Sequence, residues 1–187
     1  MENKKTTMIC AGFGGQGVMM AGKILCQTAC DTTDMNVTFF PSYGMEKRGG
    51  TANCYVCIDE EPIGAPMVNH VNNLMIFNDL SYDAFINKLE PGGNLFLNTT
   101  LVKFRGDRDD INVIEVDAGN ISVEMGSPKS LNLIMAGAFV GYTGALPVEN
   151  CVETIGHKLG GKRPDLAAIN EAAFRKGVEI GQAARKK

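Results

Sequence analysis

The sequence predicts an α/β protein: a three-layer α/β/α sandwich with a mostly parallel sheet and a helical C-terminal third. Two observations support this prediction. Up to Ala118, short apolar segments of strand length alternate with segments of helical period, and beyond Ala118 the composition becomes helical. The length of 187 residues and the hydrophobic content of 44% fit one globular domain with a substantial core.

Residues 6–40 are expected to form a strand–helix–strand unit. Residues 6–11 are short and apolar, as in a buried strand of a parallel sheet. A helix is expected over 15–32, because Val18, Gly22, Leu25 and Ala29 recur every three or four residues. A second strand is expected over 36–40, which completes a βαβ unit.

The remaining elements follow from apolar runs and their boundary residues. Further strands are expected at 51–58, 74–78, 94–98 and 112–116. Ser81 is a candidate N-cap for a short helix that reaches Glu90 and is ended by the Pro-Gly-Gly of 91–93. Four helices are expected at 119–125, 129–142, 148–158 and 165–184, and the starts of the last three lie near Pro128, Pro147 and Pro164.

Bulk properties exclude several classes of function. The net charge of -3 provides no basic face for nucleic acid. No apolar run approaches the roughly 20 residues that cross a bilayer. The N-terminal apolar stretch runs directly into Gly12, which favours a strand over a signal peptide. Scattered cysteines and no export signal favour the reducing cytoplasm.

No catalytic residue or metal ligand is predicted. Cys54 and Cys57 form a C-x2-C pair, but they lie in the middle of an expected strand, where positions three apart face opposite sides. His70 and His157 are the two histidines, and neither stands beside a serine or cysteine in a nucleophile motif. Buried thiols and surface histidines account for these residues.

A glycine-rich loop, GFGGQG at 12–17, connects the first strand to the first helix. Gly12, Gly14 and Gly17 match G-x-G-x-x-G, which permits a tight turn and presents helix N-terminal amides to an anion. A dinucleotide fold also requires an acidic residue at the end of the second strand, and here Pro41 ends it. Close packing of helix on strand, binding of another anionic group, and dinucleotide binding remain as alternatives, the last disfavoured.

A second segment, PSYGMEKRGGTANC at 41–54, follows the second strand. Tyr43 and Arg48 are the side chains that this loop could present to a ligand or partner, at the carboxyl end of a parallel strand, where open α/β sheets place ligands. The plain alternative is a tight strand connection in which Arg48 pairs with Glu46 or is solvated.

These two segments, in this order and spacing, closely resemble the γ subunit of 2-oxoacid:ferredoxin oxidoreductases. The segments EEPIGAP at 60–66, NLIMAGA at 132–138 and TGALP at 143–147 extend the resemblance over nearly the whole chain. One departure is Met45, where the family pattern has proline. The resemblance implies that residues 1–187 form a single γ-subunit domain of α/β fold.

The resemblance also implies a chemistry. Such complexes convert a 2-oxoacid, coenzyme A and oxidised ferredoxin into acyl-CoA, CO2 and reduced ferredoxin, in anaerobic metabolism. Thiamine diphosphate, magnesium and iron–sulfur clusters perform the difficult steps, mainly on other subunits. The implied partners are the α, β and ferredoxin-like δ subunits, with ferredoxin as electron acceptor, in a cytoplasmic hetero-oligomer. An isolated chain with a bare interface could also pair with a second copy.

The sequence fits that division of labour. It has no Gly-Asp-Gly…Asn motif for thiamine diphosphate, since Arg108 follows Gly106 and Asp107, and it has no C-x2-C-x2-C-x3-C-P ferredoxin run. The chain by itself is therefore expected to be inactive and to bind none of these cofactors alone. The form of the 41–54 segment looks more like the 2-oxoglutarate and branched-chain groups than the pyruvate group.

The candidate site combines both loops, which are expected to meet at the carboxyl edge of the sheet and to shape a subunit interface or the coenzyme A side of the active site. Arg48 would supply charge and Tyr43 an aromatic contact. The alternatives are a free-standing Rossmann-like dinucleotide-binding oxidoreductase and an assembly subunit without ligand. The predicted binding residues are Gly12, Gly14, Gly15, Gln16, Gly17, Ser42, Tyr43, Gly44, Arg48, Gly49, Gly50 and Thr51.

Overall fold

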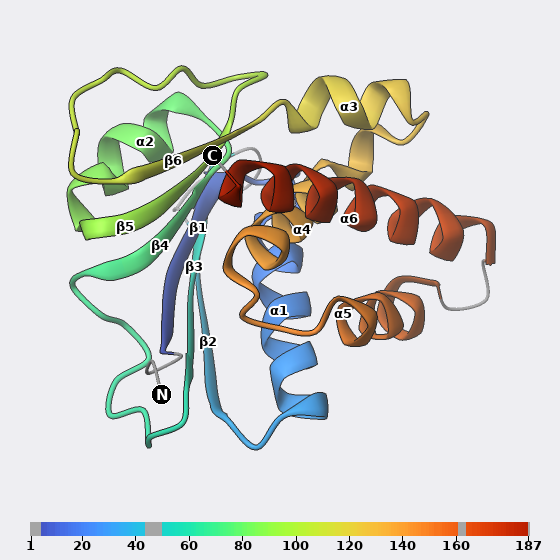
Figure 1. Cartoon of the computed structure of the whole chain (residues 1–187), viewed down its shortest axis with the longest axis horizontal. Coiled ribbons are helices and arrows are strands. Elements are labelled where there is room, and N and C mark those ends of the chain that lie inside the picture. The colour runs from blue at the N-terminus through green and yellow to red at the C-terminus, as the bar shows by residue number, and fades with distance from the viewer. Residues whose placement is uncertain (1–4, 44–49, 161–163, 187) are drawn as a thin grey trace.

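The computed structural model describes residues 5–43, 50–160 and 164–186 (Figure 1). Within these ranges the strands are β1 (Thr6–Phe13), β2 (Asn36–Tyr43), β3 (Thr51–Asp59), β4 (Val71–Ile76), β5 (Leu89–Asn98) and β6 (Asn112–Val116). The helices are α1 (Val18–Thr32), α2 (Asp79–Phe85), α3 (Ala118–Glu124), α4 (Leu131–Thr143), α5 (Val148–Ile155) and α6 (Pro164–Arg185). Short 3-10 turns η1 (Ile86–Lys88) and η2 (Pro128–Ser130) and a π-helical turn η3 (Gly156–Gly160) accompany them.

The six strands form one sheet in the order β2-β3-β1-β4-β5-β6. Strand β3 pairs antiparallel with both β2 and β1, whereas the pairs β1–β4, β4–β5 and β5–β6 are parallel. The other five strands therefore run in one direction, and only β3 is reversed among them. The predicted mostly parallel sheet is confirmed.

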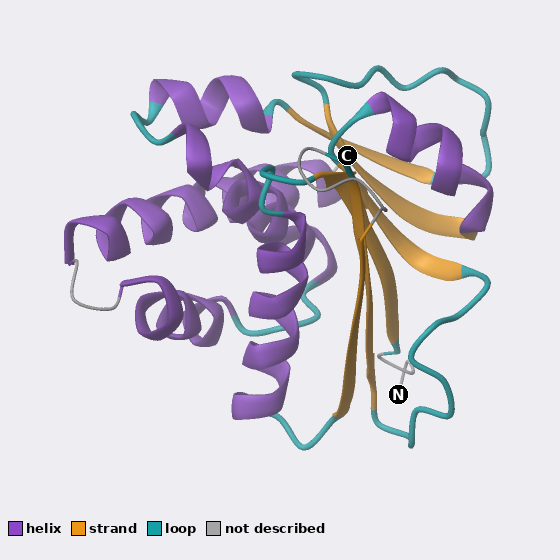
Figure 2. Ribbon diagram, turned by 180° about the vertical axis from the view of Figure 1, so that it is seen from behind, coloured by secondary structure: helices purple, strands orange, loops and turns teal. Residues whose placement is uncertain are grey.

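Helices cover both faces of the sheet, but unequally (Figures 1 and 2). Helices α1, α4, α5 and α6 pack on one face, around a core that includes Phe96, Phe139 and Phe174. Helix α2 covers part of the other face, where Tyr82 and Ile86 pack against strands β1, β4 and β5. The three-layer sandwich is confirmed, and its thicker helical layer combines α1 with helices of the C-terminal third.

Strand β3 changes the first supersecondary unit. The unit β1-α1-β2 is present as predicted, but β1 and β2 are not neighbours, because β3 lies between them and pairs with both. Strand β2 extends to Tyr43, beyond the predicted end at Phe40, because Pro41, Ser42 and Tyr43 keep their register with β3. Helix α1 begins at Val18 and not at Gly15, because Gly15 and Gly17 have φ of 100° and 75°.

Two boundary assignments around α2 were wrong. The N-cap is Asn78 and not Ser81: the Asn78 Oδ1 atom accepts the Ser81 backbone N–H at 2.9 Å, so Ser81 lies in the first turn. The helical region ends at Lys88, and the Pro-Gly-Gly of 91–93 lies within β5 as an irregularity in its pairing with β4. The irregularity leaves Pro91 outside the register pairs of β4 and β5, where its missing N–H is tolerated.

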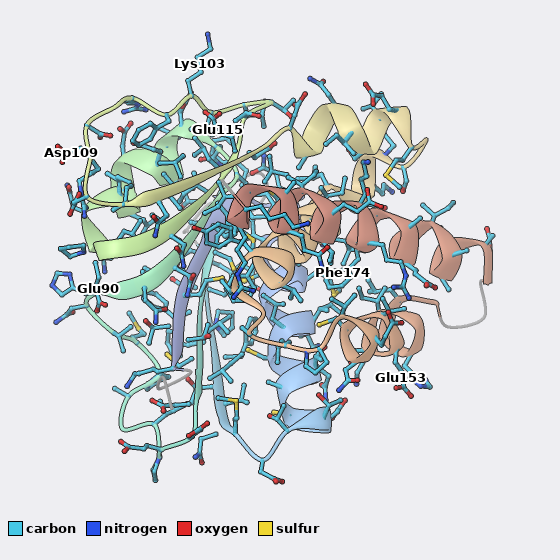
Figure 3. All side chains as sticks on the ribbon, viewed as in Figure 1. Glu90, Lys103, Asp109, Glu115, Glu153 and Phe174 are labelled. Atoms are coloured by element: carbon cyan, nitrogen blue, oxygen red, sulfur yellow. The ribbon has the colours of Figure 1, made fainter. Side chains whose placement is uncertain are left out.

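Helices α4 and α6 pack along a seam of glycines, Gly137 and Gly141 on α4 and Gly177 and Gly181 on α6. A Cβ atom on any of the four would overlap a backbone carbonyl oxygen of the facing helix. Gly137 faces Phe174 and Gly141 faces Val178, so the residue numbers rise together and the two helices run parallel. Phe174 points inward from α6, whereas the exposed Lys103, Asp109 and Glu153 side chains project outward (Figure 3).

Asparagine side chains connect the strands at the edge of the sheet where the parallel strands begin, which is its amino-terminal edge. Asn112 Nδ2 donates to Asn94 Oδ1 at 3.1 Å, Asn94 Nδ2 to Asn73 Oδ1 at 2.9 Å, and Asn73 Nδ2 to Asn72 Oδ1 at 2.7 Å. Asn72 Nδ2 completes the series by donating to the Lys5 carbonyl oxygen at 2.7 Å. This amide ladder joins the starts of β6, β5, β4 and β1.

None of the helices in the described part of the chain combines the length and apolar character needed to cross a bilayer.

Candidate functional site

The glycine loop lies at the point where the sheet changes topology. Strands β1 and β4 are parallel neighbours, but β1 leads into α1 on one face and β4 leads into α2 on the other. The helices that follow two adjacent parallel strands thus diverge, and the region between their starts at the carboxyl edge is called the crevice below. Open α/β sheets bind ligands in such a crevice, so this region is the candidate site.

The described ends of the two predicted loops meet there. The Gly14 N–H donates to the Gly50 carbonyl oxygen at 2.8 Å, and Phe13 is the register partner of Thr51. Ser42 and Tyr43 stand at the end of β2, one strand further from the crevice, and the Tyr43 side chain is 70% exposed. Gly44, Arg48 and Gly49 lie outside the described residues, so the proposed charge of Arg48 stays a prediction.

The Gln16 side chain makes hydrogen bonds within the protein through both ends of its amide. Its Oε1 atom accepts the Phe13 backbone N–H at 2.7 Å and the Asn78 Nδ2 atom at 3.3 Å. Its Nε2 atom donates to the Phe77 carbonyl oxygen at 3.4 Å. The side chain therefore spans the crevice, from the end of β1 to the residues that follow β4, and braces the loop.

The site includes two asparagines that were not predicted from the sequence. Asn78 caps α2 and donates to Gln16, as described above. The buried Asn132, in the first turn of α4, donates from Nδ2 to the Gly17 carbonyl oxygen at 3.2 Å. Asn132 opens the NLIMAGA segment, so that segment was a usable signal. Asn78 follows an apolar run and precedes Asp79, which is a pattern typical of an N-cap.

The glycines of the loop are required for different reasons. A Cβ atom on Gly12 would lie 2.7 Å from Gln16 Oε1 and 2.8 Å from Phe77 Cβ, so this glycine makes room for the brace. Gly17 combines a positive φ with close contact to Asn132. Gly15 has φ of 100° and open space around its Cβ direction, so it is exposed at the outermost part of the loop.

Among the described residues, the donors at this site are amides and not ionisable groups. Helix α1 has no side-chain N-cap hydrogen bond and no acidic residue in its first turn, so no side chain there competes for the first N–H groups. Beneath the loop, Cys10 and Cys54 are cross-strand partners. A hydrogen bond with Cys54, together with burial, raises the pKa of the Cys10 thiol well above its usual value, so this thiol is not a nucleophile at neutral pH. The described part of this arrangement can bind and orient an anion, and none of its residues is placed to act as an acid, a base or a nucleophile.

Other features of the described ranges do not form a second catalytic centre. No group of three or more His, Cys, Asp or Glu side chains among those residues is placed to hold a metal ion. A groove of about 900 Å³ lies at the amino-terminal edge, lined in part by Asn72, Glu90 and Arg185. That edge is remote from the crevice, on the side of the sheet where α/β proteins do not usually bind ligands.

Comparisons with known proteins show which family the chain resembles. The family model of pyruvate ferredoxin/flavodoxin oxidoreductase matches residues 7–180. Ketoisovalerate oxidoreductase subunit VorA of Methanothermobacter marburgensis is 34% identical over 163 residues, which are 86% of this chain and 34% of that protein. 2-Oxoglutarate synthase subunit KorC of Methanocaldococcus jannaschii is 29% identical over 174 residues, which are 92% of this chain and 91% of that protein.

Solved structures share the fold. A keto/oxoacid ferredoxin oxidoreductase γ subunit from Geobacter sulfurreducens superposes with a TM-score of 0.84 at 23% identity, over 96% of this chain and 98% of that one. The 2-oxoglutarate:ferredoxin oxidoreductase of Magnetococcus marinus, solved with 2-oxoglutarate, coenzyme A and succinyl-CoA bound, superposes with a TM-score of 0.87 at 24% identity. This chain covers 97% of its own length in that match and 32% of the other chain.

The fold and site define a three-layer α/β domain with a glycine loop at a topological switch point. The chain belongs to the pyruvate ferredoxin/flavodoxin oxidoreductase family, and its predicted resemblance to the γ subunits of 2-oxoacid:ferredoxin oxidoreductases is confirmed. The relatives are subunits of oxidoreductases. The chain spans about a third of the length of the ketoisovalerate oxidoreductase subunit that it matches.

Proposed function

We propose that this chain is the γ component of a cytoplasmic, thiamine diphosphate-dependent complex that oxidises a 2-oxoacid with coenzyme A and reduces ferredoxin. Its role is to assemble with the α, β and δ components and to hold part of coenzyme A at the glycine loop. The observation that supports the second role is the loop at the switch point, with the exposed Gly15 and the uncapped first turn of α1. These amide donors fit the phosphate groups of coenzyme A.

Binding of coenzyme A in a related complex supports the choice of ligand. The Magnetococcus marinus enzyme, which contains a region of this fold, was solved with coenzyme A bound. In this proposal the chain's own residues bind and orient: loop amides contact a phosphate, Tyr43 contacts an apolar or aromatic part, and Arg48 adds charge. Thiamine diphosphate and the iron–sulfur clusters supply the carbon–carbon cleavage and electron transfer from other subunits.

The exposed apolar side chains of the carboxyl edge support a docking role. Tyr43, Leu80 and Leu101 are 70%, 60% and 54% exposed, and they follow the ends of β2, β4 and β5, respectively. Apolar side chains gathered on one edge indicate a subunit interface. The occupant proposed here is the catalytic remainder of the complex, because a relative carries this domain within a chain about three times as long.

The proposed substrate is 2-oxoglutarate or a branched-chain 2-oxoacid. The relatives whose names support it are a 2-oxoglutarate synthase subunit and a ketoisovalerate oxidoreductase subunit. The form of the 41–54 segment, which resembles the 2-oxoglutarate and branched-chain groups, is the second reason for this choice.

A tagged pull-down from native anaerobic extract tests the assembly. Mass spectrometry identifies co-purifying subunits, and a coenzyme A-dependent viologen-reduction assay tests 2-oxoglutarate, branched-chain 2-oxoacids and pyruvate. Co-purification of thiamine diphosphate and iron–sulfur subunits with activity on one 2-oxoacid is the expected result. If the chain instead purifies alone and binds NAD(H) or FAD saturably, it is a free-standing dinucleotide-binding oxidoreductase.

Two substitutions test the roles separately. Gly15→Asp places a carboxylate where the phosphate is proposed, and the KM for coenzyme A should rise about tenfold, which corresponds to roughly 1.4 kcal/mol. A combined Leu80→Asp and Leu101→Asp variant should lose the partner subunits from the pull-down. Met67→Asp is the matched control, since Met67 is 49% exposed in the β3–β4 connection at the opposite edge. Equal retention of partners by both variants would rule out the carboxyl edge as the interface.

A further inference from the structure

The neighbours of Gln16 determine the orientation of its side-chain amide. The Phe13 N–H can only donate, so the atom that faces it at 2.7 Å must be the acceptor, Oε1. The Nε2 atom then faces the Phe77 carbonyl oxygen, which can only accept. A flipped amide would set donor against donor and acceptor against acceptor. Gln16 is thus held in one orientation across the crevice.

Asn78 joins this arrangement through both ends of its own amide. Its Oδ1 atom caps α2 by accepting the Ser81 N–H at 2.9 Å, which leaves Nδ2 as the donor to Gln16 Oε1 at 3.3 Å. Asn78 is buried, so few other partners can replace this contact. The start of α2 and the glycine loop are therefore linked by two side-chain amides.

The other end of the loop is also held. Asn132 donates to the Gly17 carbonyl oxygen, and the Gly14 N–H donates to Gly50, so the loop is bonded to α4 and to β3. Gly15 lies between these attachments with nothing near its Cβ direction. The loop therefore presents an open segment on a braced support, and the Gln16–Asn78 pair is the part of the support that crosses the switch point.

We propose that Gln16, acting with Asn78, is a positioning residue: the pair holds the glycine loop in the conformation that receives coenzyme A and does not itself contact the ligand. This inference rests on the proposed function for its ligand, but not for the bracing of the loop. Preorganised donors lose less freedom on binding, so loss of the pair raises the KM for coenzyme A more than it lowers kcat.

Neutral substitutions isolate the brace from simple charge repulsion. Gln16→Met keeps the length of the side chain and removes its three hydrogen bonds. Asn78→Ser keeps an N-cap for α2 and removes the Nδ2 donor. Asn87→Ser is the matched control, because Asn87 is an exposed asparagine of the turn that follows α2. Each variant is made in the full chain and studied both alone and in the assembled complex.

Two readouts decide the proposal. In the chain alone, hydrogen exchange of the backbone amides at 14–20 should become at least about tenfold faster in Gln16→Met and in Asn78→Ser than in the control. In the complex, each single variant should raise the KM for coenzyme A about three- to tenfold, with a smaller fall in kcat at saturating coenzyme A. The double variant should raise KM no more than the larger single effect, because Gln16→Met already removes the contact with Asn78.

Other results would overturn it. Exchange rates and KM values that match those of Asn87→Ser would show that the pair does not position the loop. Single effects that add in the double variant would show that Gln16 and Asn78 act separately. The Gly15→Asp variant separates the two proposals: if it leaves the KM for coenzyme A unchanged, the proposed ligand is wrong, and the hydrogen exchange result still decides whether the pair braces the loop.

Discussion

Glycines serve two opposite purposes in this chain, one in the α4–α6 seam and one in the loop at the switch point. In the seam, a Cβ atom on Gly177 would overlap the Ile134 carbonyl oxygen, so the missing side chain allows helix backbones to touch. In the loop, Gly15 has no neighbour within 4 Å of its Cβ direction, and its φ of 100° is the constraint. The first glycine permits contact within the protein, and the second leaves space outside it.

This difference separates residues that hold the fold from residues that serve the site, although the residue type is the same. A Cβ atom in the seam would meet rigid backbone on a neighbouring helix, so the cost is steric and falls on the folded state. A Cβ atom at Gly15 would meet solvent or a ligand, so the cost is the strain of a left-handed conformation. Four predictions test this distinction, in order of decreasing expected effect on stability.

Gly177→Ala should have the largest effect on stability, a loss of about 3 kcal/mol in the free energy of unfolding, because α4 and α6 must separate to admit the methyl group. Urea unfolding followed by circular dichroism measures it. Gly156→Ala is the control: Gly156 has an open Cβ direction and φ of -56°, so alanine should be neutral or stabilise by up to about 1 kcal/mol. Equal stability of the two variants would contradict the seam.

Gly12→Ala should cost less, about 2 kcal/mol, because its methyl group would meet the side chains of Gln16, Phe77 and Val18, which can shift where backbone cannot. The displaced Gln16 should loosen the loop, so this variant should also show faster hydrogen exchange at 14–20. The same urea titration gives the stability. A loss as large as that of Gly177→Ala would mean that the loop is packed as rigidly as the seam.

Gly15→Ala should cost about 1 kcal/mol, from backbone strain alone. Gly15→Asn should cost less, because asparagine tolerates positive φ better than alanine does. Thermal unfolding of both variants provides the comparison. If Gly15→Ala loses as much stability as Gly12→Ala, the space beside Gly15 is filled in the folded chain and the site is not open there.

Asp59→Asn should have the smallest effect and a specific pH dependence. A hydrogen bond from Lys5, at 2.9 Å, and the Glu61 backbone N–H lower the pKa of the Asp59 carboxyl in the folded state. Because the pKa is lower in the folded state, the ionised carboxylate stabilises the fold at pH values above the unfolded pKa of about 3.9. This stabilisation is lost as the pH falls through the folded pKa. The stability difference from Asp59→Asn should be constant near neutral pH and shrink below about pH 4. Acid titration of both proteins measures it, and a difference that grows in acid would contradict this sign.

The fold class, the glycine loop and its position after the first strand could be predicted from the sequence, because they depend on local periodicity and on glycine spacing. The position of β3 between β1 and β2 could not be predicted, because the local sequence pattern does not determine which strands pair with each other. The role of Gln16 was also beyond the sequence, because Phe77 and Asn78 lie about sixty residues away. The N-cap of α2 was predicted at Ser81 because serine is a good cap, but the cap is Asn78, whose position is determined by where β4 ends.

The reversed strand β3 has a consequence for the order of folding. The Gly14–Gly50 hydrogen bond and the Phe13–Thr51 register exist only after β3 has entered between β1 and β2. Strands β2 and β3 are close in sequence and are expected to pair first, whereas the partners of β1 on β3 are register pairs from Phe13↔Thr51 to Thr6↔Ile58, much further apart along the chain. During synthesis on the ribosome, the glycine loop thus takes its final shape only after β3 has emerged, which delays any encounter between the loop and other subunits until this half of the sheet is complete.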